Sequence, residues 1–223
     1  MRILVYGDSN SWGFPPDGSG LRFERGTRWP GILADALGAE VIEDALPGRT
    51  TAHDDPELHG PAMNGLAQLP AALLAHSPLD WVLIMLGTND FKARFSPGGE
   101  KIAANLLNLC DCVARHQCGP GPWDAGHGVR LAVILPPALP DVVDHSDFER
   151  HREWIGGRRA SLDLARSFRE QARGRDLLVF DAGSVVAGAE TDPIHLTANS
   201  HNVLGRALAS WLQNQDGYGE PFT

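Results

Sequence analysis

The sequence predicts an α/β fold in which a five-stranded parallel sheet is covered by helices on both faces. Five short apolar segments, each typical of a buried strand, alternate along the chain with longer segments of helical character. Strands that alternate with helices are joined by crossover connections, and these connections produce parallel sheets. The expected strands are residues 3–6, 40–45, 81–86, 129–135 and 177–180.

Chain length and composition fit a single domain of this class. The chain has 223 residues, of which 43% are hydrophobic and 21% are charged. This length supports one sizeable core, and the sequence contains no internal repeat, low-complexity segment or second core. We therefore expect one domain over residues 1–223, with a weakly ordered tail from about 214 to 223.

Helix boundaries are predicted from proline, glycine and capping residues. Pro30 suits the first turn of a helix over 30–37, and Gly38 is expected to end it. Ser96 resembles an N-cap before Pro97, and Thr197 resembles the N-cap of the last helix. The other expected helices are 66–76, despite Pro70; about 97–115; 148–173, with a break near 156–157; and 197–213.

Charge and cysteine content exclude several classes of protein. The net charge of −9 argues against binding to nucleic acid or to an anionic membrane. The N-terminal apolar run 3–6 is too short for a signal peptide, and runs such as 81–86 are too short for a membrane span. Cys110, Cys112 and Cys118 fit no zinc-binding spacing and read as reduced cysteines packed in and beside a helix. A cytoplasmic protein without a metal or cofactor is the expectation.

Ser9 is the candidate nucleophile. It follows the first expected strand, which Gly7 ends, so it lies just past the carboxyl end of that strand. In open α/β sheets, ligands bind at this edge. The alternative is that Gly7-Asp8-Ser9 forms an ordinary turn, because all three residue types favour turns.

A serine nucleophile needs a base, and His195 is the best candidate. Asp192 lies three residues earlier, close enough to place its carboxylate on Nδ1 and leave Nε2 free for Ser9. Alternatively, His195 is an ordinary histidine near a helix start, and Asp192 is a turn residue before Pro193. His201 is a weaker rival as base, since it lies inside the last helix without an aspartate in the three preceding residues.

Acyl transfer also needs donors directed at the developing oxyanion. The Ser9 backbone N–H is one candidate, and Gly48, after the second strand, can offer another N–H. The side chain of Asn89, after the third strand, can supply a third donor. The alternatives are a plain turn after Pro47 for Gly48, and an Asx turn for Asn89.

With these residues in place, the chain resembles the SGNH, or GDSL-type, hydrolases. Four blocks occur in the order of that family: Gly7-Asp8-Ser9, Gly48, Gly87-Thr88-Asn89-Asp90 and Asp192-Pro193-Ile194-His195. The resemblance implies a flavodoxin-like, doubly wound three-layer α/β/α fold, with Ser9, Asp192 and His195 as catalytic triad. It further implies an oxyanion hole of Ser9, Gly48 and Asn89. Asn10 departs from the family, which usually has leucine there.

A narrower resemblance is to small bacterial arylesterases, acyltransferases and carbohydrate acetylesterases. It rests on residues 11–13, 49–51 with Asp54 and Asp55, 84–90 with Lys92, and 180–184. It implies a homo-oligomer, often an octamer, and segments 118–128 and 136–157 are the expected contact surfaces. Trp12 and Thr88 are expected to contact substrate. For Trp12, packing in the core is an equal alternative.

Together these residues predict a serine esterase for short acyl esters, with acetyl favoured, and with acyl transfer to alcohols as a second activity. Carbohydrate acetylesterase is the alternative specific role, and the alcohol half of the substrate stays open.

A nucleotide- or flavin-binding module is an alternative of another class. It would need a phosphate loop after the first strand, but residues 7–11 hold one glycine and an aspartate that repels phosphate. An inactive oligomeric scaffold is a third alternative.

Overall fold

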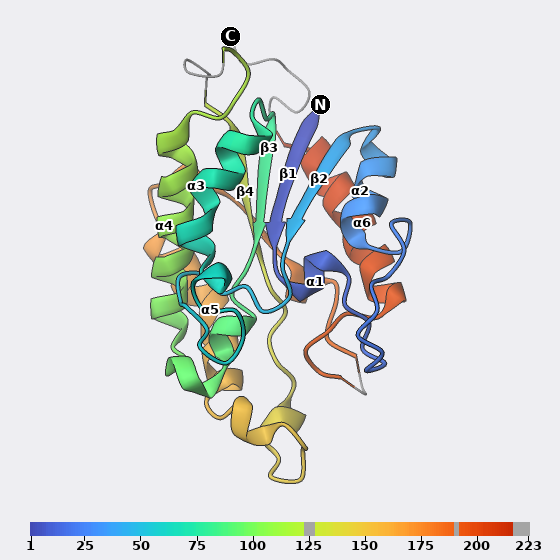
Figure 1. Ribbon diagram of the computed structural model, residues 1–223, viewed down its shortest axis with the longest axis vertical. Helices are drawn as coiled ribbons and strands as arrows, with labels where there is room; N and C mark the ends of the chain where they lie inside the picture. Colours follow the sequence, from blue (N-terminus) through green and yellow to red (C-terminus); the bar gives the residue numbers. More distant parts are fainter. Residues whose placement is uncertain (123–127, 190–191, 216–223) are drawn as a thin grey trace.

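The computed structural model describes residues 1–122, 128–189 and 192–215, and it contains the expected parallel sheet with helices on both faces (Figure 1). The strand order is β2-β1-β3-β4-β5, with every pair parallel. The predicted fold class is therefore confirmed. The strands are β1 (Arg2–Gly7), β2 (Glu40–Ala45), β3 (Trp81–Met85), β4 (Arg130–Leu135) and β5 (Leu178–Asp181).

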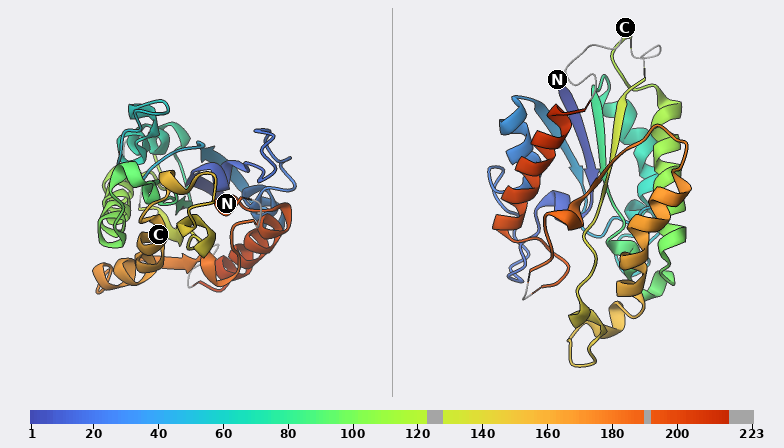
Figure 2. Two further views of the ribbon diagram at one scale, coloured as in Figure 1. Left: turned by 90° about the horizontal axis from the view of Figure 1, so that it is seen from below. Right: turned by 180° about the vertical axis from the view of Figure 1, so that it is seen from behind.

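Alternating side chains of the strands build a core on each face of the sheet. Leu4 and Tyr6 of β1 point to one face, and Ile3 and Val5 point to the other. The first face is covered by α3 (Gly65–His76), α4 (Gly99–His116) and α5 (Gly157–Gln171), and the second by α2 (Trp29–Leu37) and α6 (Ala198–Gln213) (Figures 1 and 2). Both faces of β1 are thus buried, which explains its continuous apolar sequence.

Most helix boundaries agree with the sequence, and two do not. The helix expected from 148 begins only at Gly157, because residues 148–156 form turns that include the 3₁₀ turn His151–Glu153. Gly38 ends α2 in the left-handed conformation, with φ of 59°, and the Thr197 side chain accepts a hydrogen bond from the Ser200 N–H at the start of α6. Ser96 was expected to cap α4, and that prediction is wrong. It ends the 3₁₀ turn Ala93–Phe95, and its own N–H is hydrogen-bonded to the Ala93 carbonyl, so α4 begins later, after Gly98.

The carboxyl ends of three strands lie level with one another. In the strand register, Gly7 at the end of β1 is opposite Ala45 of β2 on one side and Met85 of β3 on the other. The loops that follow these strands therefore begin side by side. This places three of the candidate sequence blocks at one edge of the sheet.

Segment 136–157 extends past this edge and includes the 3₁₀ turns Asp141–Asp144 and His151–Glu153 (Figure 1).

Cys110, Cys112 and Cys118 are buried free thiols. Within the described ranges, no helix is long and apolar enough to cross a bilayer. Parts of the predicted loops at 118–128 and 191–195, and nearly all of the predicted tail, lie outside the described residues.

Candidate active site

Ser9 is the first residue of α1 (Ser9–Trp12), a single helical turn that the sequence did not predict. The Asp8 side chain caps this turn by accepting a hydrogen bond from the Asn10 N–H at 2.9 Å. A Cβ at position 7 would lie 2.2 Å from the Ser11 Oγ, so only glycine fits at the end of β1. These local constraints fix the direction of the Ser9 side chain, which is 5% exposed.

The structure brings Ser9, His195 and Asp192 together in one line of hydrogen bonds. His195 Nε2 lies 3.1 Å from Ser9 Oγ, and His195 Nδ1 lies 2.6 Å from an oxygen of Asp192. Burial opposes ionisation of Asp192, but its hydrogen bond with His195 and the nearby positive charges lower its pKa overall. The carboxylate is therefore ionised at neutral pH and can stabilise a positive imidazolium.

Asn10 holds the loop that carries His195. Its side-chain amide donates to the carbonyl of Ile194 at 3.0 Å and accepts from the N–H of Leu196 at 3.0 Å. Ile194 and Leu196 are the residues on either side of His195. Asn10 itself is buried, with 1% of its surface exposed. Asn10 stands where the family usually has leucine, and it ties the turn of Ser9 to the loop of His195. A leucine side chain could not form these two hydrogen bonds.

The three candidate oxyanion donors belong to residues that line the hollow beside Ser9, namely Ser9, Gly48 and Asn89. Asn89 Nδ2 donates one hydrogen to the Arg49 carbonyl at 3.1 Å, which orients the amide and leaves its second hydrogen available. Within the described chain, the backbone N–H groups of Ser9 and Gly48 have no hydrogen-bond partner. Gly48 has φ of +92°, and a Cβ there would lie 2.5 Å from Leu58, so this loop also requires glycine.

A buried carboxyl group connects the loops of Gly48 and Asn89. Asp90 accepts hydrogen bonds from both the N–H and the hydroxyl of Thr51. Burial raises the pKa of Asp90 to about 7, and it raises the pKa of Asp8 to about 6. Sequence reasoning missed the function of Asp90 as a link between these loops, because nothing in the sequence indicates its partner 39 residues away.

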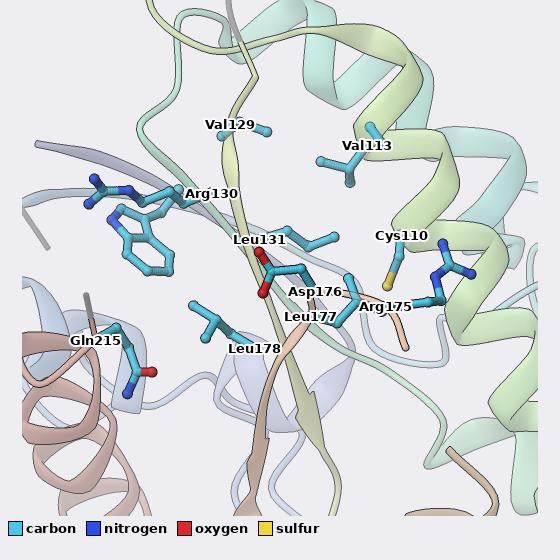
Figure 3. A pocket seen from close by; sticks show the side chains of 12 residues that line it. Cys110, Val113, Val129, Arg130, Leu131, Arg175, Asp176, Leu177, Leu178 and Gln215 are labelled. Carbon is cyan, nitrogen blue, oxygen red and sulfur yellow. The ribbon is translucent and has the colours of Figure 1, made fainter. Parts of the chain in front are cut away.

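The hollow beside Ser9 has a volume of about 170 Å³. Gly48, Asn89 and His195 line it, together with Lys92 and Arg150. A larger hollow of about 630 Å³ lies at the opposite edge of the sheet, where β3, β4 and β5 begin (Figure 3). Because it lies at the amino ends of the strands, that larger hollow is separate from the candidate site.

Two residues that were expected to contact substrate do not line the hollow, namely Trp12 and Thr88. Gly13 ends α1 in the left-handed conformation, and the chain then turns so that Phe14 lies against the His195 ring, with centroids 4.6 Å apart. The half-buried Trp12 ring contacts the Phe14 ring and the Arg22 guanidinium instead. Thr88 is buried.

His201, the rival base, is buried in α6 away from Ser9. Its Nδ1 accepts a hydrogen bond from the Trp29 N–H at 3.3 Å. Burial, with smaller effects from the charges of Arg28 and His195, lowers its pKa to about 4. His201 is therefore a neutral core residue.

Comparison of the whole chain and its fold with known proteins identifies similar enzymes. A family model described as "GDSL-like Lipase/Acylhydrolase family" matches residues 5–203. The structure is similar to the native aryl esterase of M. smegmatis, with 37% identity, a TM-score of 0.85, and coverage of 96% of this chain and 98% of that chain. It is equally similar in fold to Est24, a carbohydrate acetylesterase from Sinorhizobium meliloti, with 33% identity, a TM-score of 0.85 and coverage of 96% and 98%. None of the curated proteins compared with the chain matches it. The family match spans most of the sequence, and the chain belongs to the GDSL-like lipase/acylhydrolase family.

Proposed function

We propose that this protein is a serine esterase that hydrolyses short-chain acyl esters through an acyl-enzyme on Ser9. The observation that carries the proposal is the continuous line from Ser9 Oγ through His195 to Asp192, with contacts of 3.1 and 2.6 Å. A serine hydroxyl needs such a base to become a nucleophile at neutral pH. Membership in an acylhydrolase family and similarity to esterase structures support the same reaction.

The proposed reaction proceeds in two halves. His195 Nε2 takes the proton from Ser9 Oγ as the oxygen attacks the ester carbonyl, and Asp192 stabilises the imidazolium. The oxyanion forms opposite the N–H groups of Ser9 and Gly48 and the amide of Asn89. His195 then protonates the departing alcohol. Water, or a second alcohol, takes the acyl group from Ser9 by the reverse sequence of proton transfers.

The size of the hollow favours short acyl groups. About 170 Å³ is well below the ~300–1,000 Å³ that is typical of pockets for drug-sized ligands. Acetyl esters fit this space, whether the alcohol is aryl, as in the M. smegmatis relative, or a carbohydrate, as in Est24. Acyl transfer to alcohols is a second activity of the same acyl-enzyme.

Hydrolysis of p-nitrophenyl acetate, butyrate and octanoate tests this proposal. The three esters share a leaving group, so differences in kcat/KM report the fit of the acyl chain. We expect kcat/KM to be highest for acetate and to fall with chain length. Absence of hydrolysis of all three esters would contradict the proposed function, and equal rates would contradict the short-chain preference.

Replacing Asn89 with alanine is expected to lower kcat by about 10²–10³, because one oxyanion donor is lost. The Arg49 carbonyl also loses its 3.1 Å partner, so thermal unfolding should be measured alongside. Steady-state kinetics with p-nitrophenyl acetate provide the check. A change confined to KM would make Asn89 a binding residue and remove it from the oxyanion hole.

Replacing Asn10 with leucine is expected to lower kcat roughly 10- to 100-fold with little change in KM, because His195 loses its fixed position. Asn202→Leu, the same chemical change on the exposed face of α6, is the matched control. Kinetics of both variants should be compared with their melting temperatures. Wild-type kcat in Asn10→Leu would show that the two hydrogen bonds do not position the base.

We further propose that the protein is a homo-oligomer, as the narrower family resemblance implies, and that it is cytoplasmic, which its free cysteines support. Segment 136–157, which extends past the catalytic edge, is the candidate contact surface (Figure 1). Ile155 in this segment is 53% exposed and gives the proposed contact surface an apolar side chain. Light scattering on the purified protein measures the oligomeric state directly.

A further inference from the structure

We propose that the preferred esters carry an anionic group, a carboxylate or phosphate, that binds Lys92 and Arg150 beside the catalytic serine. This inference rests on the proposed esterase function and adds the chemical class of its substrate.

Two hollows adjoin each other beside Ser9, and together we call them the groove. The hollow of about 170 Å³ beside Ser9 and a second one of about 520 Å³ share Leu58, Lys92 and Arg150 as lining residues. A substrate whose ester lies at Ser9 can therefore extend past these three side chains. Lys92 is only three residues beyond Asn89, the proposed oxyanion donor, so the lysine and the ester site are carried by the same loop.

Lys92 is a largely buried cation whose ammonium group has only long contacts with the described part of the chain. The residue is 6% exposed, and its Nζ forms two ion pairs. Its ion pairs are long: the Nζ is 3.7 Å from Glu153 and 4.0 Å from Asp55. Burial lowers the pKa of Lys92, as expected for a cation that lacks close compensation. An anionic ligand in the groove would give the ammonium a closer partner.

The carboxylates near Lys92 already have closer partners. Arg94 donates to both Asp55 and Glu57 at 2.8 Å. Arg150 contacts Glu153 through Nη2 at 2.8 Å and through Nε at 2.9 Å. These pairs leave Lys92 with no carboxylate oxygen of the described chain closer to its Nζ than 3.7 Å.

The balance of charge in the groove supports an anionic ligand. Four cations line the outer hollow (Lys92, Arg94, Arg150 and Arg152), against Glu57 and Glu153. Counting the buried Asp55 as a third carboxylate still leaves one positive charge, in a chain whose net charge is −9. A local excess of positive charge in an acidic protein concentrates anions at this groove.

Two matched pairs of esters test the proposal. 4-Acetoxybenzoate and its methyl ester differ by a negative charge in the alcohol half, whereas p-nitrophenyl hydrogen succinate and p-nitrophenyl methyl succinate differ in the acyl half. For each pair, the ratio of kcat/KM for the anionic ester to that for the neutral ester is measured in each protein. The ratio cancels general loss of activity, because both esters meet the same active site.

Lys92→Met is expected to lower this ratio by about 10-fold or more in at least one pair, because a hydrogen bond between charged groups is lost. Lys92→Arg, which keeps the charge, should retain most of the ratio. Lys101→Met is the matched control, since Lys101 is the only other lysine of the sequence, is exposed on α4 and lines neither hollow. The pair that responds identifies which half of the substrate carries the anion.

An unchanged ratio in both pairs for Lys92→Met would overturn the proposal. If that variant does not fold, as judged by its melting temperature, Arg150→Met takes its place with the same expected direction. Failure of the esterase function itself looks different, because the wild-type protein would then hydrolyse neither member of either pair.

Discussion

Ser9→Ala is expected to lower kcat for p-nitrophenyl acetate by about 10⁵- to 10⁶-fold, because the variant cannot form an acyl-enzyme. The only side-chain partner of Ser9 Oγ in the described chain is His195 Nε2 at 3.1 Å, so little folding stability depends on the hydroxyl. The melting temperature should therefore stay close to that of the wild type. Loss of activity without loss of stability identifies a catalytic residue.

Ser11→Ala is the matched control for this variant. Ser11 lies two residues away on the same helical turn, and its buried Oγ has no hydrogen-bond partner in the described chain. Removal of this hydroxyl should leave most of the activity. If Ser9→Ala kept its activity within about 10-fold of the wild type, Ser9 would not be the nucleophile, because covalent catalysis contributes far more than that.

Asp192→Asn is expected to lower kcat by about 10⁴-fold. The amide has nearly the same shape as the carboxylate but is neutral, so it cannot stabilise the imidazolium and does not enforce the tautomer with Nδ1 protonated. One Asp192 oxygen also accepts from the Ile194 N–H at 3.0 Å, and the asparagine oxygen can keep this bond. The loop should therefore remain folded while the base loses its orientation.

Asp163→Asn provides the control for the loss of a carboxylate. Asp163 forms ion pairs with Arg159 and Arg166 on the outer side of α5, away from the hollow beside Ser9. Its replacement should leave kcat unchanged. A loss of less than about 10-fold in Asp192→Asn would mean that His195 does not depend on this carboxylate.

The sequence was sufficient to predict the sheet because each strand is a short apolar run bounded by turn residues. It also predicted the meeting of Ser9, Asp192 and His195, since parallel strands with aligned carboxyl ends bring their following loops together. The register confirms this alignment for β1, β2 and β3, with Gly7 opposite Ala45 and Met85. The contact of His195 with Ser9 shows that the segment after β5 reaches the same edge. Local pattern and topology were enough for these features.

Features that depend on contacts distant in sequence could not be predicted. The partners of Asn10 lie 184 and 186 residues away, so its link to the His195 loop has no local signal. Phe14, rather than Trp12, contacts His195 because Gly13 redirects the chain after α1. The cationic groove likewise depends on segment 136–157 folding back so that Arg150 lies near Lys92.

Labelling with a fluorophosphonate, followed by peptide mapping, tests the central claim most directly, because the reagent reacts with an activated serine. The tryptic peptide 3–22 contains Ser9 together with Ser11 and Ser19, so fragment ions must assign the adduct. The account predicts one adduct per chain, on Ser9, at a rate that falls sharply in Asp192→Asn and with no labelling in Ser9→Ala. An adduct on another residue, or no adduct on active wild-type protein, would contradict it.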